Sequence, residues 1–179
     1  MTDTLSDTIA ALGDDAEIGH ILNEVCALTG MGFAAVAFVS EERWIACQVE
    51  DRIGFGLDPG GELEIRKTIC DDIRKGGKAI VIDDTSQDPD WWNHPVPVLY
   101  GFKSYASLPI VVGGHFFGTL CAIDPAPRAS PLAGRMAEIE ALAARVAALL
   151  EAKPGAAAAA GAGRDLASRS AGRPTQSPA

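Results

Sequence analysis

The segment from residue 103 to residue 123 constrains the fold of this chain more than any other. Two apolar runs of strand length, Lys103–Val112 and His115–Ile123, flank the dipeptide Gly113-Gly114. Glycine readily adopts the positive φ angles that a two-residue turn between antiparallel strands requires. The pattern therefore predicts a β-hairpin, whose apolar faces must be covered by other parts of the chain.

A second hairpin is predicted nearer the N-terminus. Phe33–Val39 is apolar at every position, which is typical of a central strand buried on both faces. Arg43–Val49 alternates in character, which predicts a half-buried strand with Trp44 on the opposite face from Ile45. A brief strand is expected at Ala79–Ile82. Adjacent hairpins of this kind indicate an antiparallel sheet.

Helices are predicted at both ends of the sheet region. Residues 5–12 form a short amphipathic pattern, and Asp14 or Asp15 can cap a longer helix that ends at Gly30. A third helix is expected over residues 131–152, and its apolar residues follow heptad spacing: Leu132, Met136, Ile139, Ala143, Val146 and Leu150. This seam can pack on its own domain or pair with a second copy. Helices around hairpins give the fold class α+β.

Composition excludes several kinds of partner. The formal net charge is −9, so the surface should repel nucleic acid and anionic lipid. No apolar run approaches the length of about 18 residues that a membrane-spanning helix needs. The acidic N-terminus lacks the basic region of a signal peptide, so we expect a cytoplasmic protein. The four scattered cysteines are expected to be reduced: Cys26, Cys47, Cys70 and Cys121.

The composition changes near residue 153. Residues 1–152 contain the predicted helices and strands and are expected to form one domain. Residues 153–179 are rich in Ala, Gly and Arg, and Leu166 is their one large aliphatic residue. Such a segment buries too little apolar surface to repay the entropy of ordering. We therefore expect a disordered tail over residues 153–179.

Several segments resemble the GAF domain family. The runs Ser104–Ile110 and Phe117–Asp124, joined by the Gly-Gly turn, resemble the C-terminal hairpin of these domains. Thr68–Cys70 and Ile80–Asp84 stand where the family has its short helix and next strand. The resemblance covers most of residues 15–150. It implies an antiparallel five- or six-stranded sheet with terminal helices on one face and a loop-covered pocket on the other.

The resemblance also implies a role. GAF domains bind cyclic nucleotides, bilins, haem and other small molecules, and their terminal helices often form dimers. We therefore expect a sensory small-molecule-binding module in bacterial signal transduction, similar to the domains of two-component systems, with no output domain of its own. Its partners are expected to be an unidentified small molecule, a second copy held through the terminal helices, and a separate signalling protein. The identity of any cofactor stays unknown.

Two alternatives to a ligand sensor remain open. Some GAF proteins reduce free methionine sulfoxide through pocket cysteines, and Cys70 stands at a suitable place for this reaction or for a thiol redox sensor. The resolving cysteine expected in the long loop is absent from Ser86–Lys103, so an enzyme is not expected. The second alternative is a dimerisation module that binds no ligand.

Cys70 is the candidate site residue whose side chain is most open to chemical reaction. Thr68–Asp71 has the spacing of a capping box with Asp in the last position, which places Cys70 in the first turn of a helix near Arg66 and Lys67. Helix N-termini and nearby cations lower a thiol pKa, whereas the two following aspartates raise it. A small buried residue without reactivity is the alternative.

Two loops are expected to frame the pocket, the glycine-rich segment 51–61 and the long segment 83–97. The predicted ligand-binding residues are Phe55, Cys70, Trp91, Trp92, His94 and Tyr105. Tyr100 and Phe102 add aromatic surface near the mouth, and such aromatics can instead fill the pocket themselves. No histidine and cysteine spacing suits zinc, so no metal site is predicted. The sequence also has no Cys-His pair of the kind to which a bilin is covalently attached.

Overall fold

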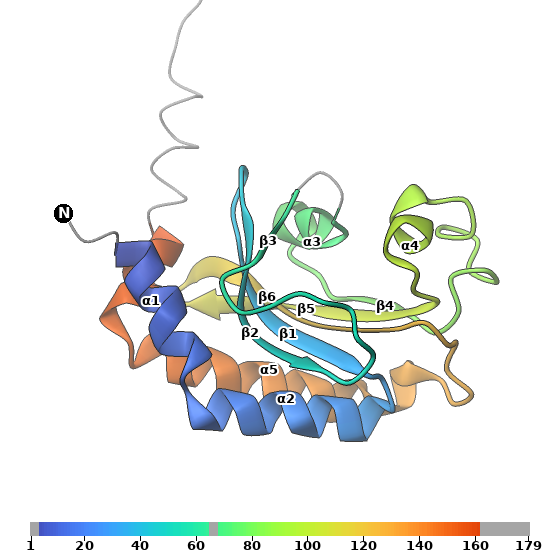
Figure 1. Cartoon of the computed structure of the whole chain (residues 1–179), viewed down its shortest axis with the longest axis horizontal. Coiled ribbons are helices and arrows are strands. Elements are labelled where there is room, and N and C mark those ends of the chain that lie inside the picture. Colours follow the sequence, from blue (N-terminus) through green and yellow to red (C-terminus); the bar gives the residue numbers. More distant parts are fainter. Residues whose placement is uncertain (1–3, 65–67, 162–179) are drawn as a thin grey trace, which may run out of the picture.

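The chain folds around one antiparallel sheet (Figure 1). The computed structural model describes residues 4–64 and 68–161. The sheet has six strands in the order β3-β2-β1-β6-β5-β4, and every neighbouring pair is antiparallel. The predicted α+β class with an antiparallel five- or six-stranded sheet is therefore confirmed.

The strands lie close to their predicted places. Their bounds are β1 Phe33–Val39, β2 Trp44–Asp51, β3 Glu62–Leu63, β4 Ile80–Ile82, β5 Ser104–Val112 and β6 His115–Asp124. The turn between β5 and β6 has positive φ angles at Gly113 and Gly114, as a two-residue hairpin requires. Strand β1 pairs with β6, which brings the two predicted hairpins together in one sheet.

Helices cover one face of the sheet. They are α1 Thr4–Gly13, α2 Ala16–Thr29 and α5 Met136–Glu151, with a 3-10 turn at Leu132–Arg135. In Figure 1, α2 and α5 run side by side beneath the strands. Asp15 caps α2 by accepting hydrogen bonds from the backbone of Glu17 and Ile18, and Gly30 ends that helix in the left-handed conformation. The predicted cap and stop of this helix are confirmed.

The other face is covered by shorter pieces, α3 Cys70–Gly76, α4 Pro95–Tyr100 and the loops around them (Figure 1). Helix α4 was not predicted, because segment 83–97 was interpreted as a loop. Pro95 stands in its first turn, and the His94 side chain accepts a hydrogen bond from the Val96 backbone. Proline is favoured at the first helical position, which explains a helix in so short a segment.

The prediction that β2 is half-buried was wrong. Its first five residues are buried, so both faces of this part of the strand are covered. Trp44 belongs to the apolar cluster on the loop side, while Ile45 belongs to the cluster under the helices, so these two residues do lie on opposite faces as predicted. Ala46 pairs with Ala37 and Gln48 with Val36, so Cys47 is the extra residue of a bulge. The bulge changes the alternation of faces from Gln48 onward.

The segment after α5 also differs from the prediction of a tail beginning at residue 153. Residues 154–161 are helical, and Ala156 and Ala160 are buried. Lys153 forms an ion pair with Asp15 at 3.2 Å, and Gly155 packs so closely on Thr8 that a Cβ there would overlap its hydroxyl. Small residues thus allow close helix contact, which compensates for their small apolar area. Residues 162–179 lie outside the described part of the chain.

The heptad seam of α5 faces the interior of its own domain. Ile139, Ala143, Val146 and Leu150 are buried in the cluster that includes α2 and the sheet. The seam therefore packs on its own domain, as the first of the two interpretations expects. Among the described residues, no helix combines the length and apolar composition needed to cross a membrane.

Gly118 provides a test of the sheet. A Cβ at this position would lie 1.8 Å from the Ala37 carbonyl oxygen, which is a backbone atom that cannot move aside without moving β1. We expect Gly118→Ala to lower the free energy of unfolding by at least about 2 kcal/mol. Urea denaturation measures this change. Gly134→Ala is the matched control, because a Cβ there meets no atom within 4 Å; equal stability of the two variants would contradict the close approach.

Candidate functional site

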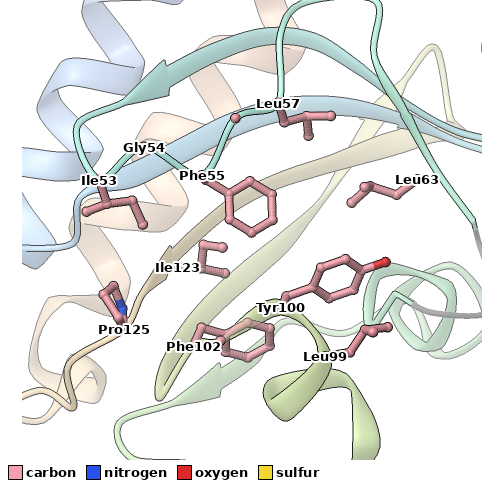
Figure 2. A pocket seen from close by; sticks show the side chains of 12 residues that line it. Ile53, Gly54, Phe55, Leu57, Leu63, Leu99, Tyr100, Phe102, Ile123 and Pro125 are labelled. Atoms are coloured by element: carbon pink, nitrogen blue, oxygen red, sulfur yellow. The ribbon is translucent and has the colours of Figure 1, made fainter.

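An open cavity lies on the loop side of the sheet, between the glycine-rich loop and α4 (Figure 2). We call it the outer cavity; its volume is about 500 Å³. Its lining residues are Ile53, Gly54, Phe55, Gly56, Leu57, Leu63, Leu99, Tyr100, Gly101, Phe102, Ile123 and Pro125. In Figure 2, Phe55 projects from the loop toward Tyr100 and Phe102, and Ile123 lies on the strand behind them. Aromatic and aliphatic groups therefore dominate its walls.

Asp51 fixes the shape of the glycine-rich loop. Its carboxylate accepts hydrogen bonds from the backbone N–H groups of Ile53, Phe55 and Gly56 at 3.1, 3.1 and 2.9 Å. Partial desolvation raises the pKa of this carboxyl, but these bonds and one from Gly54 hold the pKa below its ordinary value. The loop is thus held by one anchored carboxylate, and the Phe55 ring is placed at the cavity wall.

The aromatic rings around the outer cavity touch one another. The Phe55 ring centroid lies 4.9 Å from that of Phe33 on β1 and 6.1 Å from that of Tyr100 at the end of α4. The Phe102 ring stacks on Tyr105 at 5.5 Å. Contacts at these distances are favourable for aromatic pairs.

A narrower space continues inward from the outer cavity. We call it the inner cavity; its volume is about 50 Å³. The two share the lining residues Phe55, Leu57, Leu63, Tyr100, Phe102 and Ile123. The inner cavity adds Phe33, Trp44, Thr68, Ile69, Cys70, Val96, Tyr105 and Cys121. It therefore leads from the aromatic mouth to two cysteine side chains.

The Cys70 sulfur lies at the centre of a group of polar side chains. It is 3.2 Å from Thr119 Oγ1, 3.5 Å from the Tyr105 hydroxyl and 3.8 Å from Ser107 Oγ. These partners stand on β5 and β6, so the thiol points from α3 onto the sheet. All four side chains are buried. The group, with Cys121, is called the Cys70 cluster below.

The predicted capping box is wrong, although Cys70 does lie in the first turn of a helix. Helix α3 begins at Cys70, Ile69 occupies the cap position, and no side chain caps the helix. Arg66 lies outside the described residues. The Asp71 carboxylate, expected to oppose a thiolate, forms ion pairs with Arg74 and Lys75. The environment of Cys70 is therefore set by hydrogen-bond donors on the sheet.

These donors lower the pKa of Cys70 to about 6. The largest cause is a hydrogen bond with the Cys121 thiol; desolvation opposes it, and Thr119, Tyr105 and Trp44 add to the lowering. The pKa of Cys121 is raised, first by the same hydrogen bond and then by burial. Burial, followed by the charge of Cys70, also raises the pKa of Tyr105. Only one member of this group is therefore poised to ionise.

Trp44 has an unusual indole N–H group. Its nitrogen is buried and meets no hydrogen-bond acceptor at normal distance among the described residues. Trp44 lines the inner cavity together with Cys70. A buried donor without a partner is costly, and such groups often mark a place where a ligand or water belongs.

The structure brings together half of the predicted site residues. Phe55, Cys70 and Tyr105 line the connected cavities. Trp91, Trp92 and His94 line a separate groove of about 290 Å³ near Thr85, Ser86 and Pro97. The two hollows meet at the shared residues Gly101, Phe102 and Pro125. The difference arises because α4 stands between these three residues and the cavity.

Sequence reasoning missed Trp44, Ser107, Thr119 and Cys121 as site residues. Trp44 was expected opposite the buried face of its strand, and Cys121 was expected only to be a reduced cysteine. The alternation of β5 and β6 places Tyr105, Ser107, Thr119 and Cys121 on one face, and this signal was available from the sequence. Within residues 4–64 and 68–161, no three His, Cys, Asp or Glu side chains converge so as to hold a metal ion.

The pKa of Cys70 gives a direct test. We expect the rate of its alkylation by iodoacetamide to rise with pH around a midpoint of about 6, compared with an ordinary value near 9, because only the thiolate reacts. Peptide mass spectrometry at a series of pH values measures the rate. Cys121→Ala should move the midpoint upward, since it removes the largest cause of the lowering. A wild-type midpoint at or above 9 would contradict the donor arrangement.

Comparison with known structures supports the fold. The GAF domain of Thermosynechococcus elongatus PixJ in its blue-light absorbing form superposes with a TM-score of 0.60 at 13% identity, covering 97% of this chain and 99% of that one. The GAF domain of a two-component sensor histidine kinase from Bacillus halodurans gives 0.57 at 14% identity, covering 76% and 92%. A type II free methionine-R-sulfoxide reductase from Thermoplasma acidophilum gives 0.54 at 12% identity, covering 85% and 94%.

The sequence agrees with this likeness. No curated protein gives a significant match to the chain. Residues 16–152, however, match the GAF domain family, and this segment contains all six strands and the helices α2 to α5. Sheet order, helix placement and sequence therefore lead to one conclusion: the chain belongs to the GAF domain family.

Proposed function

We propose that this GAF domain is a cytoplasmic sensory module that binds a small molecule in the connected outer and inner cavities. The observation that carries the proposal is that the two spaces adjoin and share six lining residues, so that an aromatic mouth lies next to the buried Cys70 cluster. Ligand sites are commonly concave, mostly apolar and equipped with a few convergent polar groups. The family supports a sensory role in signal transduction.

The shape of the site restricts the ligand. The outer cavity, at about 500 Å³, is large enough for a ring system beside Phe55 and Tyr100. The inner cavity, at about 50 Å³, admits only a small substituent. The N–H of Trp44, which has no acceptor at normal hydrogen-bond distance, favours a substituent that accepts a hydrogen bond. We infer a flat, largely apolar molecule that carries one small acceptor group.

Binding is proposed to act through the position of α4 and the glycine-rich loop. Both segments contribute walls to the outer cavity from opposite sides, so a ligand that contacts both favours one relative placement. The neighbouring groove shares Phe102 with the cavity and presents the exposed side chain of Trp92, which is 65% exposed. This change in the placement of α4 and the loop would be recognised by another protein. That protein is a separate signalling protein or a second copy docked on the outer surfaces of the terminal helices.

The ligand proposal is tested with a library of aromatic metabolites. We expect at least one compound to raise the thermal unfolding midpoint in a saturable manner, because a ligand that binds only the folded state stabilises it. Calorimetric titration of that compound then gives its Kd. Phe55→Ala should weaken binding by about tenfold or more, since it removes one ring face from the site.

Trp92→Ala is the matched control for this titration. It also removes a large aromatic side chain, but one that lies outside the cavities and is largely exposed. Its Kd should equal that of the wild type. Loss of affinity in Trp92→Ala with full affinity in Phe55→Ala would place the ligand in the neighbouring groove and contradict the proposal.

The enzymatic alternative is favoured by one observation, the position of Cys70 inside the ligand cavity with Cys121 beside it. The sulfoxide reductase among the similar structures shows that this fold supports such chemistry in that protein. For this chain we expect no reduction of free methionine-R-sulfoxide with dithiothreitol, measured by chromatography of the methionine formed. Turnover that disappears in Cys70→Ser and persists in Cys26→Ser would establish the alternative instead.

A further inference from the structure

Two of the four cysteines open onto the same cavity. Cys70 and Cys121 both line the inner cavity, and both thiols are free. Cys26 and Cys47 belong to the cluster on the other face of the sheet. Burial raises their pKa values to about 11 and about 12, so neither is a ready nucleophile. The chemistry available to thiols in this domain is therefore concentrated at one pair.

The strand pairing explains why these two thiols meet. Cys121 stands two residues after Thr119 on β6 and therefore points to the same face of the sheet. It pairs directly with Ser107 on β5. Thr119 and Ser107 both contact the Cys70 sulfur, at 3.2 and 3.8 Å, and Cys121 is the neighbour that contributes most to the lowered pKa of Cys70. Cys70 and Cys121 therefore lie close together at the end of the inner cavity.

Going beyond reversible ligand binding, we propose that Cys70 and Cys121 form a hydroperoxide-responsive redox pair, in which Cys70 is the attacking thiol and Cys121 the resolving thiol. In the first step the Cys70 sulfur attacks the terminal oxygen of an organic hydroperoxide and the O–O bond breaks. Cys70 becomes a sulfenic acid, and the proton from its thiol completes the alcohol product. In the second step the Cys121 sulfur displaces hydroxide from that sulfenic acid, which gives a disulfide and one water molecule.

The surrounding groups suit this oxidant. Thr119 and Tyr105 have hydroxyl groups next to the reacting sulfur, and the Trp44 N–H, which also favours a negative charge there, has no acceptor at normal hydrogen-bond distance. Donors placed at developing negative charge stabilise a departing oxygen. The aromatic mouth formed by Phe55 and Tyr100 favours a hydroperoxide with an apolar tail over hydrogen peroxide. The disulfide would fasten α3 to β6 and change the end of the ligand cavity.

The test uses the full chain, reduced and then exposed to a small molar excess of cumene hydroperoxide. The remaining thiols are alkylated after unfolding, and a non-reducing digest is mapped by mass spectrometry. We expect one linked peptide pair containing Cys70 and Cys121, with Cys26 and Cys47 alkylated, and reversal by dithiothreitol. Oxidation by cumene hydroperoxide should be at least about tenfold faster than by hydrogen peroxide, because an apolar tail gains from burial.

Two variants separate the steps. Cys121→Ser should stop at a sulfenic acid on Cys70 that dimedone traps, and Cys26→Ser, also a buried cysteine, should form the disulfide like the wild type. Alkylation of both Cys70 and Cys121 after peroxide treatment of the wild type would overturn the proposal, as would a disulfide between two chains. If Cys121→Ser does not fold, the peptide map of the wild-type protein decides the question by itself. Ligand-induced thermal shifts of the reduced protein are unaffected by this result, so the two proposals fail separately.

Discussion

The central strand β1 is buried along its whole length, and this burial sets the requirement that the rest of the structure meets. Each face of a buried strand needs its own cover, because apolar surface left in water costs about 25 cal/mol per Å². The helices α2 and α5 supply a continuous cover on one face. The β1–β6 contact at Gly118 is so close that no side chain fits there, which keeps the two hairpins in one sheet.

The second face has a different kind of cover. Short helices and loops meet over the sheet there, and they leave the outer and inner cavities between them. Asp51 holds the glycine-rich loop by its backbone, so a loop residue, Phe55, occupies the wall and packs against Phe33 of β1. The same face carries the Cys70 cluster, where donors from the sheet surround one sulfur atom. Function is therefore expected where the cover is incomplete, whereas the helical side serves stability.

The sequence was sufficient to predict the hairpins, the helices α1, α2 and α5, and the α+β class, because their signals are local periodicities and caps. It failed at Trp44, whose face of β2 is covered by the loop-side cluster, and at residues 154–161, where close packing of small residues replaces large apolar area. Cys70 and Phe55 were predicted in the pocket. The partners of Cys70 were missed, because contacts across two strands and a helix depend on tertiary placement that no single segment encodes.

The central claim is that the outer cavity beside Phe55 and Tyr100 receives a ligand. Localisation of a bound probe tests it most directly: crystals of the protein soaked with a brominated aromatic fragment give an anomalous signal at the bromine position. The account predicts this signal inside the outer cavity, next to these two rings. An outer cavity filled by its own side chains, or a signal confined to the groove beside Trp91 and Trp92, would contradict it.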